Sequence, residues 1–283
     1  MKAKFVDLYE YFGKTRPEMG TGTLTCYLQN TPDKLASMLR PAVLVLPGGG
    51  YSHVSQREGE PVALRFLARG YNAFVLDYSI SPLRFPTALQ EAAMAMAYIR
   101  RNAETLEIDP AMVAAIGFSA GGHLCGTLGM LYDAPEVAGI GTARELRPDA
   151  LGLCYPVAVS WGPTHEGSFK NLCGEDTALR HRLSLDKLVR PDMPPVYLWH
   201  TRDDGTVPCR NTLVLANALA EAGVDMALRV YRHGYHGLST ADEQTNPAGE
   251  LPELSPDIPH WPEEMMGFFR EIGLKSGHLE DKR

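Results

Sequence analysis

A serine flanked by glycines is the first feature of the sequence that could carry out chemistry. Residues 117–121 read Gly-Phe-Ser-Ala-Gly, after the apolar run 113–116 and before a small-residue, helix-like stretch at 120–130. A strand that turns sharply into a helix strains the turn residue and holds its side chain clear of the sheet, and the glycines avoid collisions with the neighbouring strand and helix. The pattern predicts that Ser119 is a nucleophile, with an ordinary glycine-rich turn as the alternative.

A serine nucleophile needs a base, commonly histidine, which a carboxylate orients. Two later runs that we expect to be strands are each followed by such residues. The acidic candidates are Asp203 and Asp204, and the histidine candidates are His233 and His236. The chain order of serine, carboxylate and histidine is the one expected for a nucleophile on this kind of turn. We expect these side chains to meet Ser119 at one edge of the sheet.

Three consecutive glycines, residues 48–50, follow another apolar run at 42–46. Consecutive glycines cost backbone entropy, so the bare backbone must be needed at this point. A phosphate-binding loop is one alternative, but the sequence contains neither a Gly-x-x-x-x-Gly-Lys pattern nor a dinucleotide-binding fingerprint.

The elements that must position these residues alternate along the chain. The expected strands are 23–28, 42–46, 73–76, 112–116, 151–155, 196–199 and 226–231, with a turn at 30–33 after the first. The expected helices are 58–69, 87–102 (capped by Thr87), 120–130, 211–222 and 261–272. Such alternation predicts one α/β domain over residues 1–283, with a mostly parallel central sheet and helices on both faces. Reaction sites of these sheets lie at the carboxyl ends of the strands.

Two segments are too long to be simple connections. Residues 156–195 form a cap-like insertion with a predicted helix at 184–189, and residues 238–262 are polar and rich in proline. Long loops of this kind commonly shape pockets. We therefore expect both to shape the substrate pocket, although 238–262 could equally be a surface loop.

Bulk composition excludes several classes of protein. The 283 residues are 45% hydrophobic, and the formal net charge of -7 comes without basic clusters, so nucleic acid is not an expected partner. No apolar stretch approaches the roughly 20 residues that span a membrane. Five scattered cysteines are typical of reduced, buried thiols in a cytoplasmic protein. We expect no cofactor and no metal; a metal site built from His233, His236 and the aspartates is conceivable, but no tight ligand motif supports one.

The sequence resembles the α/β-hydrolases, specifically the acetyl-esterase and lipase-like group related to hormone-sensitive lipase and bacterial carbohydrate acetyl esterases. The segments that carry the resemblance are PGGGY (47–51), LDYSISPLRFP (76–86), GFSAGGHL (117–124), HTRDDGTVP (200–208) and GYHG (234–237). Together with the order of strands and helices, the resemblance extends from about residue 40 to residue 272. It implies the α/β-hydrolase fold.

The resemblance also implies a role for individual residues. The family's acidic residue stands four positions before the proline of a D-x-x-V-P pattern, which selects Asp204 over Asp203. The histidine that precedes a glycine is His236, so the implied catalytic residues are Ser119, Asp204 and His236. His200 and His233 are then expected to be structural or pocket-lining.

The triple glycine corresponds to the family's oxyanion-hole motif, His-Gly-Gly-Gly, in which Pro47 here replaces the histidine. The implied donors to the oxyanion are the backbone amides of Gly49, Gly50 and Ala120. Further candidates for the substrate pocket are Tyr51, Trp161 and His123, and we also expect His123 to be packed and hydrogen-bonded within its helix.

The implied function is that of a serine esterase acting on small-molecule esters with short acyl groups, such as acetyl groups on sugars or xylan fragments. The sugar part of this expectation rests on the resemblance alone. One alternative is a serine peptidase of the prolyl-oligopeptidase type, although such enzymes usually carry a large additional domain. The other is a non-catalytic binding protein, because a fold by itself does not prove activity.

Overall fold

A central sheet of short, largely buried strands organises the molecule. The computed structural model describes residues 1–31, 38–274 and 277–278, so part of the turn predicted at 30–33 lies outside the described residues. The strands are β1 (Lys2–Asp7), β2 (Thr23–Leu28), β3 (Met38–Leu46), β4 (Asn72–Asp77), β5 (Ile108–Phe118), β6 (Ala150–Cys154), β7 (Val196–Thr201), β8 (Met226–Tyr231) and β9 (Gly277–His278).

The strand order is β1-β2-β4-β3-β5-β6-β7-β8, with β9 beside β3. All pairs from β4 to β8 along this order are parallel, whereas β1 and β2 run antiparallel to their neighbours. The mostly parallel sheet confirms the predicted fold class. Because parallel strands end at the same edge, the loops after β3, β5, β7 and β8 converge.

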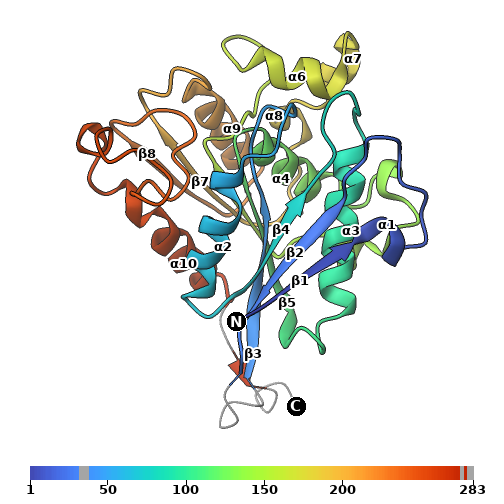
Figure 1. Cartoon of the computed structure of the whole chain (residues 1–283). Coiled ribbons are helices and arrows are strands. Elements are labelled where there is room, and N and C mark those ends of the chain that lie inside the picture. The colour runs from blue at the N-terminus through green and yellow to red at the C-terminus, as the bar shows by residue number, and fades with distance from the viewer. Residues whose placement is uncertain (32–37, 275–276, 279–283) are drawn as a thin grey trace.

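Helices cover both faces of the sheet (Figure 1). They are α1 (Leu8–Tyr11), α2 (Glu60–Leu67), α3 (Thr87–Arg101), α4 (Ala120–Met130), α5 (Ala143–Leu146), α6 (Glu166–Cys173), α7 (Thr177–Arg182), α8 (Leu185–Leu188), α9 (Arg210–Glu221) and α10 (Trp261–Glu271). Alternate residues of β3 face opposite sides, as the two-residue period of a strand requires. Leu44 belongs to the hydrophobic core under α3, α4 and α9, and Val43 to the core under α2 and α10.

Three local features differ from the sequence-based expectation. Strand β1 was not predicted, because most of its side chains are exposed at the edge of the sheet and show no alternating apolar pattern. Helix α2 begins at Glu60, since Gln56–Glu58 form a separate 3-10 turn. Thr87 does not cap α3; it is the first helical residue, and Pro86 occupies the capping position without a side-chain hydrogen bond.

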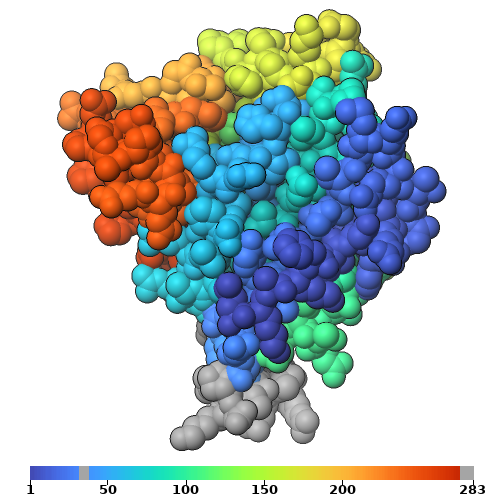
Figure 2. Space-filling model, viewed as in Figure 1, coloured from blue at the N-terminus to red at the C-terminus, as the bar shows by residue number. Residues whose placement is uncertain are grey.

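The insertion at 156–195 contains three helices, α6, α7 and α8, where the sequence predicted one. Helices α6 and α7 lie at the top of the view in Figure 1, and Figure 2 shows the insertion, in yellow, forming that end of the molecular surface. The insertion therefore lies over the edge of the sheet at which the parallel strands end.

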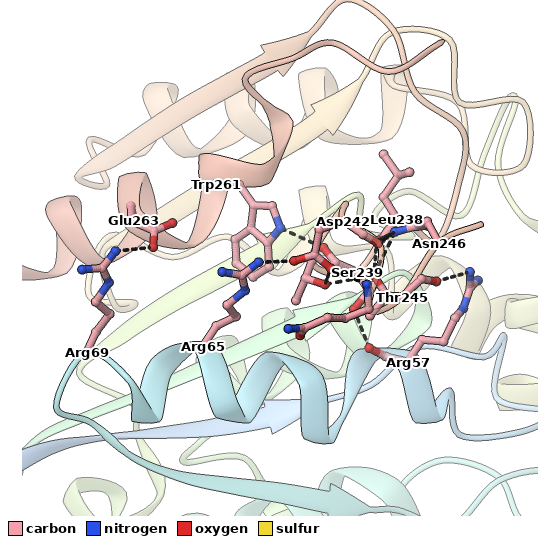
Figure 3. Close-up of polar contacts among 12 residues, drawn as sticks. Arg57, Arg65, Arg69, Leu238, Ser239, Asp242, Thr245, Asn246, Trp261 and Glu263 are labelled. Atoms are coloured by element: carbon pink, nitrogen blue, oxygen red, sulfur yellow. Dashed lines mark hydrogen bonds and ion pairs between the residues drawn. The ribbon is translucent and has the colours of Figure 1, made fainter. Parts of the chain in front are cut away.

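The segment 238–262 packs beside α2 (Figure 3). Arg65 of α2 pairs with Asp242, and Arg69 Nη2, just beyond α2, lies 2.9 Å from Glu263 Oε1. The indole of Trp261 donates a 2.8 Å hydrogen bond to the carbonyl of Ser239. The pair of Arg65 with Asp242 holds the segment against α2, and the bond of Trp261 joins its two ends.

Candidate active site

Ser119 sits on a strained turn between β5 and α4. Its backbone has φ 53° and ψ −119°, a left-handed conformation that is rare for a residue with a side chain. A β-carbon on Gly117 would lie 2.1 Å from the carbonyl oxygen of Gly121, and one on Gly121 would lie 2.1 Å from that of Leu46. Both flanking glycines are therefore required by close backbone approach, for the reason that the sequence pattern predicts.

His236, in the loop after β8, connects Ser119 with Asp204. Its Nε2 lies 2.7 Å from Ser119 Oγ, and its Nδ1 lies 2.6 Å from Asp204 Oδ2. An ionised carboxylate can only accept hydrogen bonds, so Nδ1 carries the proton and Nε2 is free to accept the serine proton. The structure thus brings together the three residues that the sequence singled out.

Asp204, in the loop after β7, is buried and fully hydrogen-bonded. Its Oδ1 accepts from the amides of Thr206 and Val207, each at 2.9 Å. Its Oδ2 lies 3.2 Å from Nε2 of the buried His200 as well as beside His236. Burial alone would raise the pKa of this carboxyl, but hydrogen bonds from His200 and His236 outweigh it and hold the pKa well below its usual range.

A second aspartate–histidine pair ties the same two loops together. His233 Nδ1 lies 2.6 Å from Asp203 Oδ2, and both side chains are more than 40% exposed. Neither residue lines the cavity that holds Ser119. The neighbouring carboxylates therefore have different partners.

The glycine loop after β3 presents its backbone to the same cavity. Gly49 and Gly50 have φ values of 125° and 62°, which favour glycine. A β-carbon on Gly48 would lie 2.9 Å from Cβ of Ser119, so only glycine allows the loop to approach the serine so closely. Among the described residues, the amides of Gly49, Gly50 and Ala120 have no hydrogen-bond acceptor, which leaves them available to a ligand.

Sequence reasoning missed a buried carboxylate beneath this loop. Glu58 Oε2 accepts a 2.8 Å hydrogen bond from the amide of Gly48, and Oε1 accepts one of 2.7 Å from the hydroxyl of Tyr155. The ring of Tyr155 packs edge-on against His236, with centroids 5.1 Å apart. Glu58 thereby links the glycine loop with the support of the histidine; no motif in the sequence signals this link.

Tyr51 and His123, which were expected in the pocket, lie beneath it instead. Both side chains are buried, and the Tyr51 hydroxyl lies 2.9 Å from His123 Nδ1. His123 Nε2 donates to the carbonyl of Leu183 at 2.8 Å, so the hydrogen bonds expected of this histidine are present. Burial lowers the pKa of His123 to about 4.

Trp161 is also absent from the cavity wall. The guanidinium carbon of Arg210 lies 4.2 Å from the centroid of the Trp161 ring. The indole nitrogen of Trp161 lies 3.2 Å from Asp186 Oδ2. These partners direct the indole toward the surface of the insertion, where it is 41% exposed.

Ser119 and His236 open into a cavity of about 300 Å³. It is lined by Gly49, Gly50, Ser52, His53, Ser55, Arg57, Glu58, Ser119, His165, Thr206, His236 and Gly237. None of these lining residues has an aliphatic or phenyl side chain. His165 comes from the insertion, whereas the segment 238–262 contributes no lining residue, so the expectation that this segment shapes the pocket is wrong. The wall is thus built from polar residues and glycines, and their carbon atoms form part of its surface.

Three further observations concern the described residues as a whole. Within them, no group of three or more histidine, cysteine, aspartate or glutamate side chains is arranged to hold a metal ion. No helix in the described part of the chain has the length and apolarity needed to cross a bilayer. The five cysteines are free and buried.

Known proteins resemble this chain in sequence and fold. A family model described as BD-FAE matches residues 29–145. Over 78% of its own length, the chain is 38% identical to endo-1,4-beta-xylanase B of Butyrivibrio fibrisolvens. Over 77% of its own length, it is 27% identical to an acetylxylan esterase of Xylanibacter ruminicola. It spans only 35% and 44% of these two relatives. The crystal structure of an acetyl ester-xyloside bifunctional hydrolase from Caldicellulosiruptor lactoaceticus is similar with a TM-score of 0.78, 36% identity and 89% coverage of each chain.

Proposed function

Because this chain belongs to the α/β-hydrolase superfamily, in its acetyl-esterase and lipase-like group, we propose that it is a serine esterase that removes short acyl groups, chiefly acetyl, from carbohydrate alcohols. The observation that carries the proposal is the chain of hydrogen bonds from Ser119 through His236 to Asp204 at a cavity lined by polar residues and glycines.

In the proposed acylation step, Ser119 Oγ attacks the carbonyl carbon of the ester while its proton passes to His236 Nε2. Ionised Asp204 stabilises the imidazolium that forms. The amides of Gly49, Gly50 and Ala120 donate hydrogen bonds to the oxyanion, and loss of one such donor typically costs about 10²- to 10³-fold in kcat. His236 then protonates the ester oxygen, so the C–O bond breaks and the alcohol leaves.

Deacylation repeats these steps with a water molecule as the nucleophile. His236 takes a proton from a water molecule, whose oxygen attacks the acyl carbon of the acyl-serine. The second tetrahedral intermediate collapses, His236 returns the proton to Ser119 Oγ, and the carboxylic acid is released. Each residue thus ends in its starting protonation state.

The absence of aliphatic and phenyl side chains from the cavity wall supports a short acyl group. Each buried methylene adds about 0.8 kcal/mol of transfer free energy only where an apolar surface receives it. Two large apolar residues of the segments expected to shape the pocket, Phe169 and Leu238, are instead buried in the two hydrophobic cores. A longer acyl chain would therefore gain little from this cavity.

A carbohydrate alcohol is supported by the names of two of the similar proteins, an acetylxylan esterase and an acetyl ester-xyloside hydrolase. Polar lining side chains such as Ser52, Ser55 and Thr206 could bind sugar hydroxyls. The substrate is then a small acetylated sugar. The buried, free thiols support a reducing compartment, the cytoplasm.

Two measurements test the proposal. A fluorophosphonate probe should label the wild-type protein and not the Ser119→Ala variant, since only an activated serine reacts. On p-nitrophenyl esters from acetate to octanoate, kcat/KM should be highest at acetate or propionate, and acetylated xylo-oligosaccharides should release acetate. Absence of labelling would favour a binding protein, and cleavage of prolyl peptides instead of esters would favour a peptidase. A maximum at hexanoate or longer would identify a lipase-like carboxylesterase.

A further inference from the structure

Within the described part of the chain, His165 is the only residue of the insertion that lines the cavity. It stands at the N-terminal cap of α6, and its Cε1 lies 3.4 Å from the position that a β-carbon on Gly50 would occupy. The insertion is fixed there, because Asn171 Nδ2 donates a 2.8 Å hydrogen bond to the carbonyl of Gly50. His165 therefore faces the cavity beside the proposed oxyanion donors.

The contacts of His165 define which ring nitrogen carries the proton. Its Nδ1 accepts a hydrogen bond from the backbone amide of the buried Ser168 at 3.3 Å and lies 2.8 Å from the hydroxyl of Ser168. Because Nδ1 accepts, the proton of the neutral ring must be on Nε2. Burial and the nearby His236 lower the pKa of His165, which favours this neutral form.

Nε2 of His165 has no hydrogen-bond acceptor among the described residues. The carboxylate of Glu58 is also part of the cavity wall, but its oxygens already accept from Gly48 and Tyr155. The Nε2–H group is thus a preorganised donor whose acceptor must come from a ligand or from water.

We propose that the Nε2–H group of His165 donates a hydrogen bond to a hydroxyl or ring oxygen in the alcohol part of the substrate, and that it thereby selects esters of polyhydroxylated alcohols. This inference rests on the proposed esterase function. An acetyl group has one oxygen, the carbonyl, which the amides of the glycine loop bind. The ester oxygen receives its proton from His236. Any other oxygen within reach of His165 belongs to the alcohol.

A conservative variant separates this donor from the structural role of His165. In His165→Asn, the side-chain oxygen can still accept from Ser168 at the helix cap, where asparagine is favoured, but the donor at Nε2 is lost. His181→Asn is the matched control, because His181 is an exposed histidine at the end of α7 outside the cavity wall. His165→Gln, whose longer amide returns a donor near Nε2, is the rescue variant.

Two substrates of similar ring size provide the readout: a mono-acetylated methyl β-xyloside, and cyclohexyl acetate, which lacks the hydroxyl groups and the ring oxygen. Loss of one hydrogen bond to the substrate should lower kcat/KM of His165→Asn for the xyloside roughly 5- to 20-fold. For cyclohexyl acetate it should change less than about twofold, His165→Gln should recover part of the selectivity, and His181→Asn should match the wild type.

Equal losses of His165→Asn on both substrates would overturn the inference, because the ring would then act on the glycine loop. An unchanged kcat/KM for the xyloside would also overturn it. A wild type that hydrolyses cyclohexyl acetate but not the xyloside would disprove the selection while the esterase function stands. A wild type that hydrolyses neither ester nor p-nitrophenyl acetate would disprove the proposed function itself.

Discussion

Asp203 and Asp204 are adjacent in the chain, but their carboxylates bind different histidines, each at 2.6 Å: Asp203 binds His233, and Asp204 binds His236. Only the second pair reaches Ser119. The two pairs also differ in environment, since the carboxylate of Asp204 is fully buried and that of Asp203 is 42% exposed. The same substitution at the two positions should therefore have different effects.

Asp204→Asn should lower kcat by on the order of 10⁴-fold or somewhat less, because an amide favours the wrong tautomer of the histidine. Asp203→Asn should change kcat only a few fold, since an exposed ion pair contributes about 0–1 kcal/mol. Initial rates on p-nitrophenyl acetate measure both. If Asp203→Asn were the more damaging change, the acidic role would belong to Asp203.

Ser119 and His236 should behave as one catalytic unit. Either Ser119→Ala or His236→Ala should lower kcat by roughly 10³- to 10⁶-fold, and the double variant should be little worse, because neither residue can act without the other. The three variants are compared with p-nitrophenyl acetate at matched concentrations. Losses that multiply in the double variant would contradict a shared proton transfer between these residues.

The sequence singles out the catalytic candidates because each of them stands in a local pattern. Ser119 stands in a five-residue motif, and the carboxylate and histidine candidates each follow an apolar run of strand length. The parallel sheet then places the ends of these runs together. Strand β1 was not predicted because it has no such local pattern. Its side chains are mostly exposed at the edge of the sheet, so they need not alternate between apolar and polar.

Residues whose role depends on distant partners cannot be predicted in this way. The role of Glu58 depends on its hydrogen bond with Tyr155, which is 97 positions away in the chain. The position of His165 depends on the contact that holds α6 over the glycine loop. His200 was expected to be structural or pocket-lining; in the structure it is buried against Asp204. Tyr51 follows the glycine loop in sequence, yet its side chain is buried under it.

His123 should make stability depend on pH. Burial lowers its pKa in the folded protein to about 4, from an ordinary value of 6.5. The unfolded chain therefore binds the proton more readily between these values, so stability is present at pH 7 and is lost as the pH falls from 6.5 toward 4. A shift of this size corresponds to a loss of about 2 kcal/mol in the free energy of unfolding between pH 7 and pH 5.

Urea unfolding of the wild type and of His123→Gln at the two pH values measures this contribution. Glutamine can still donate to the carbonyl of Leu183 but does not titrate. The variant should lose less stability than the wild type between pH 7 and pH 5, whereas the exposed control His181→Gln should lose as much as the wild type. An equal loss in wild type and His123→Gln would show that other groups cause the pH dependence.

Glu58→Gln should lower kcat although Glu58 has no part in the proton transfers. A glutamine offers one acceptor oxygen where the carboxylate offers two, so either the amide of Gly48 or the hydroxyl of Tyr155 loses its acceptor. The first loss should shift the glycine loop that precedes the proposed oxyanion donors, and the second should loosen the ring that packs against His236. Since removing one oxyanion donor costs about 10²- to 10³-fold, a displaced loop should cost roughly 10- to 100-fold in kcat. KM for p-nitrophenyl acetate should change little, because the effect falls on the transition state.

Glu60→Gln, at an exposed position two residues later, is the control and should have wild-type kinetics. If Glu58→Gln lowered the free energy of unfolding while kcat stayed at the wild-type value, Glu58 would support the fold and not the oxyanion loop.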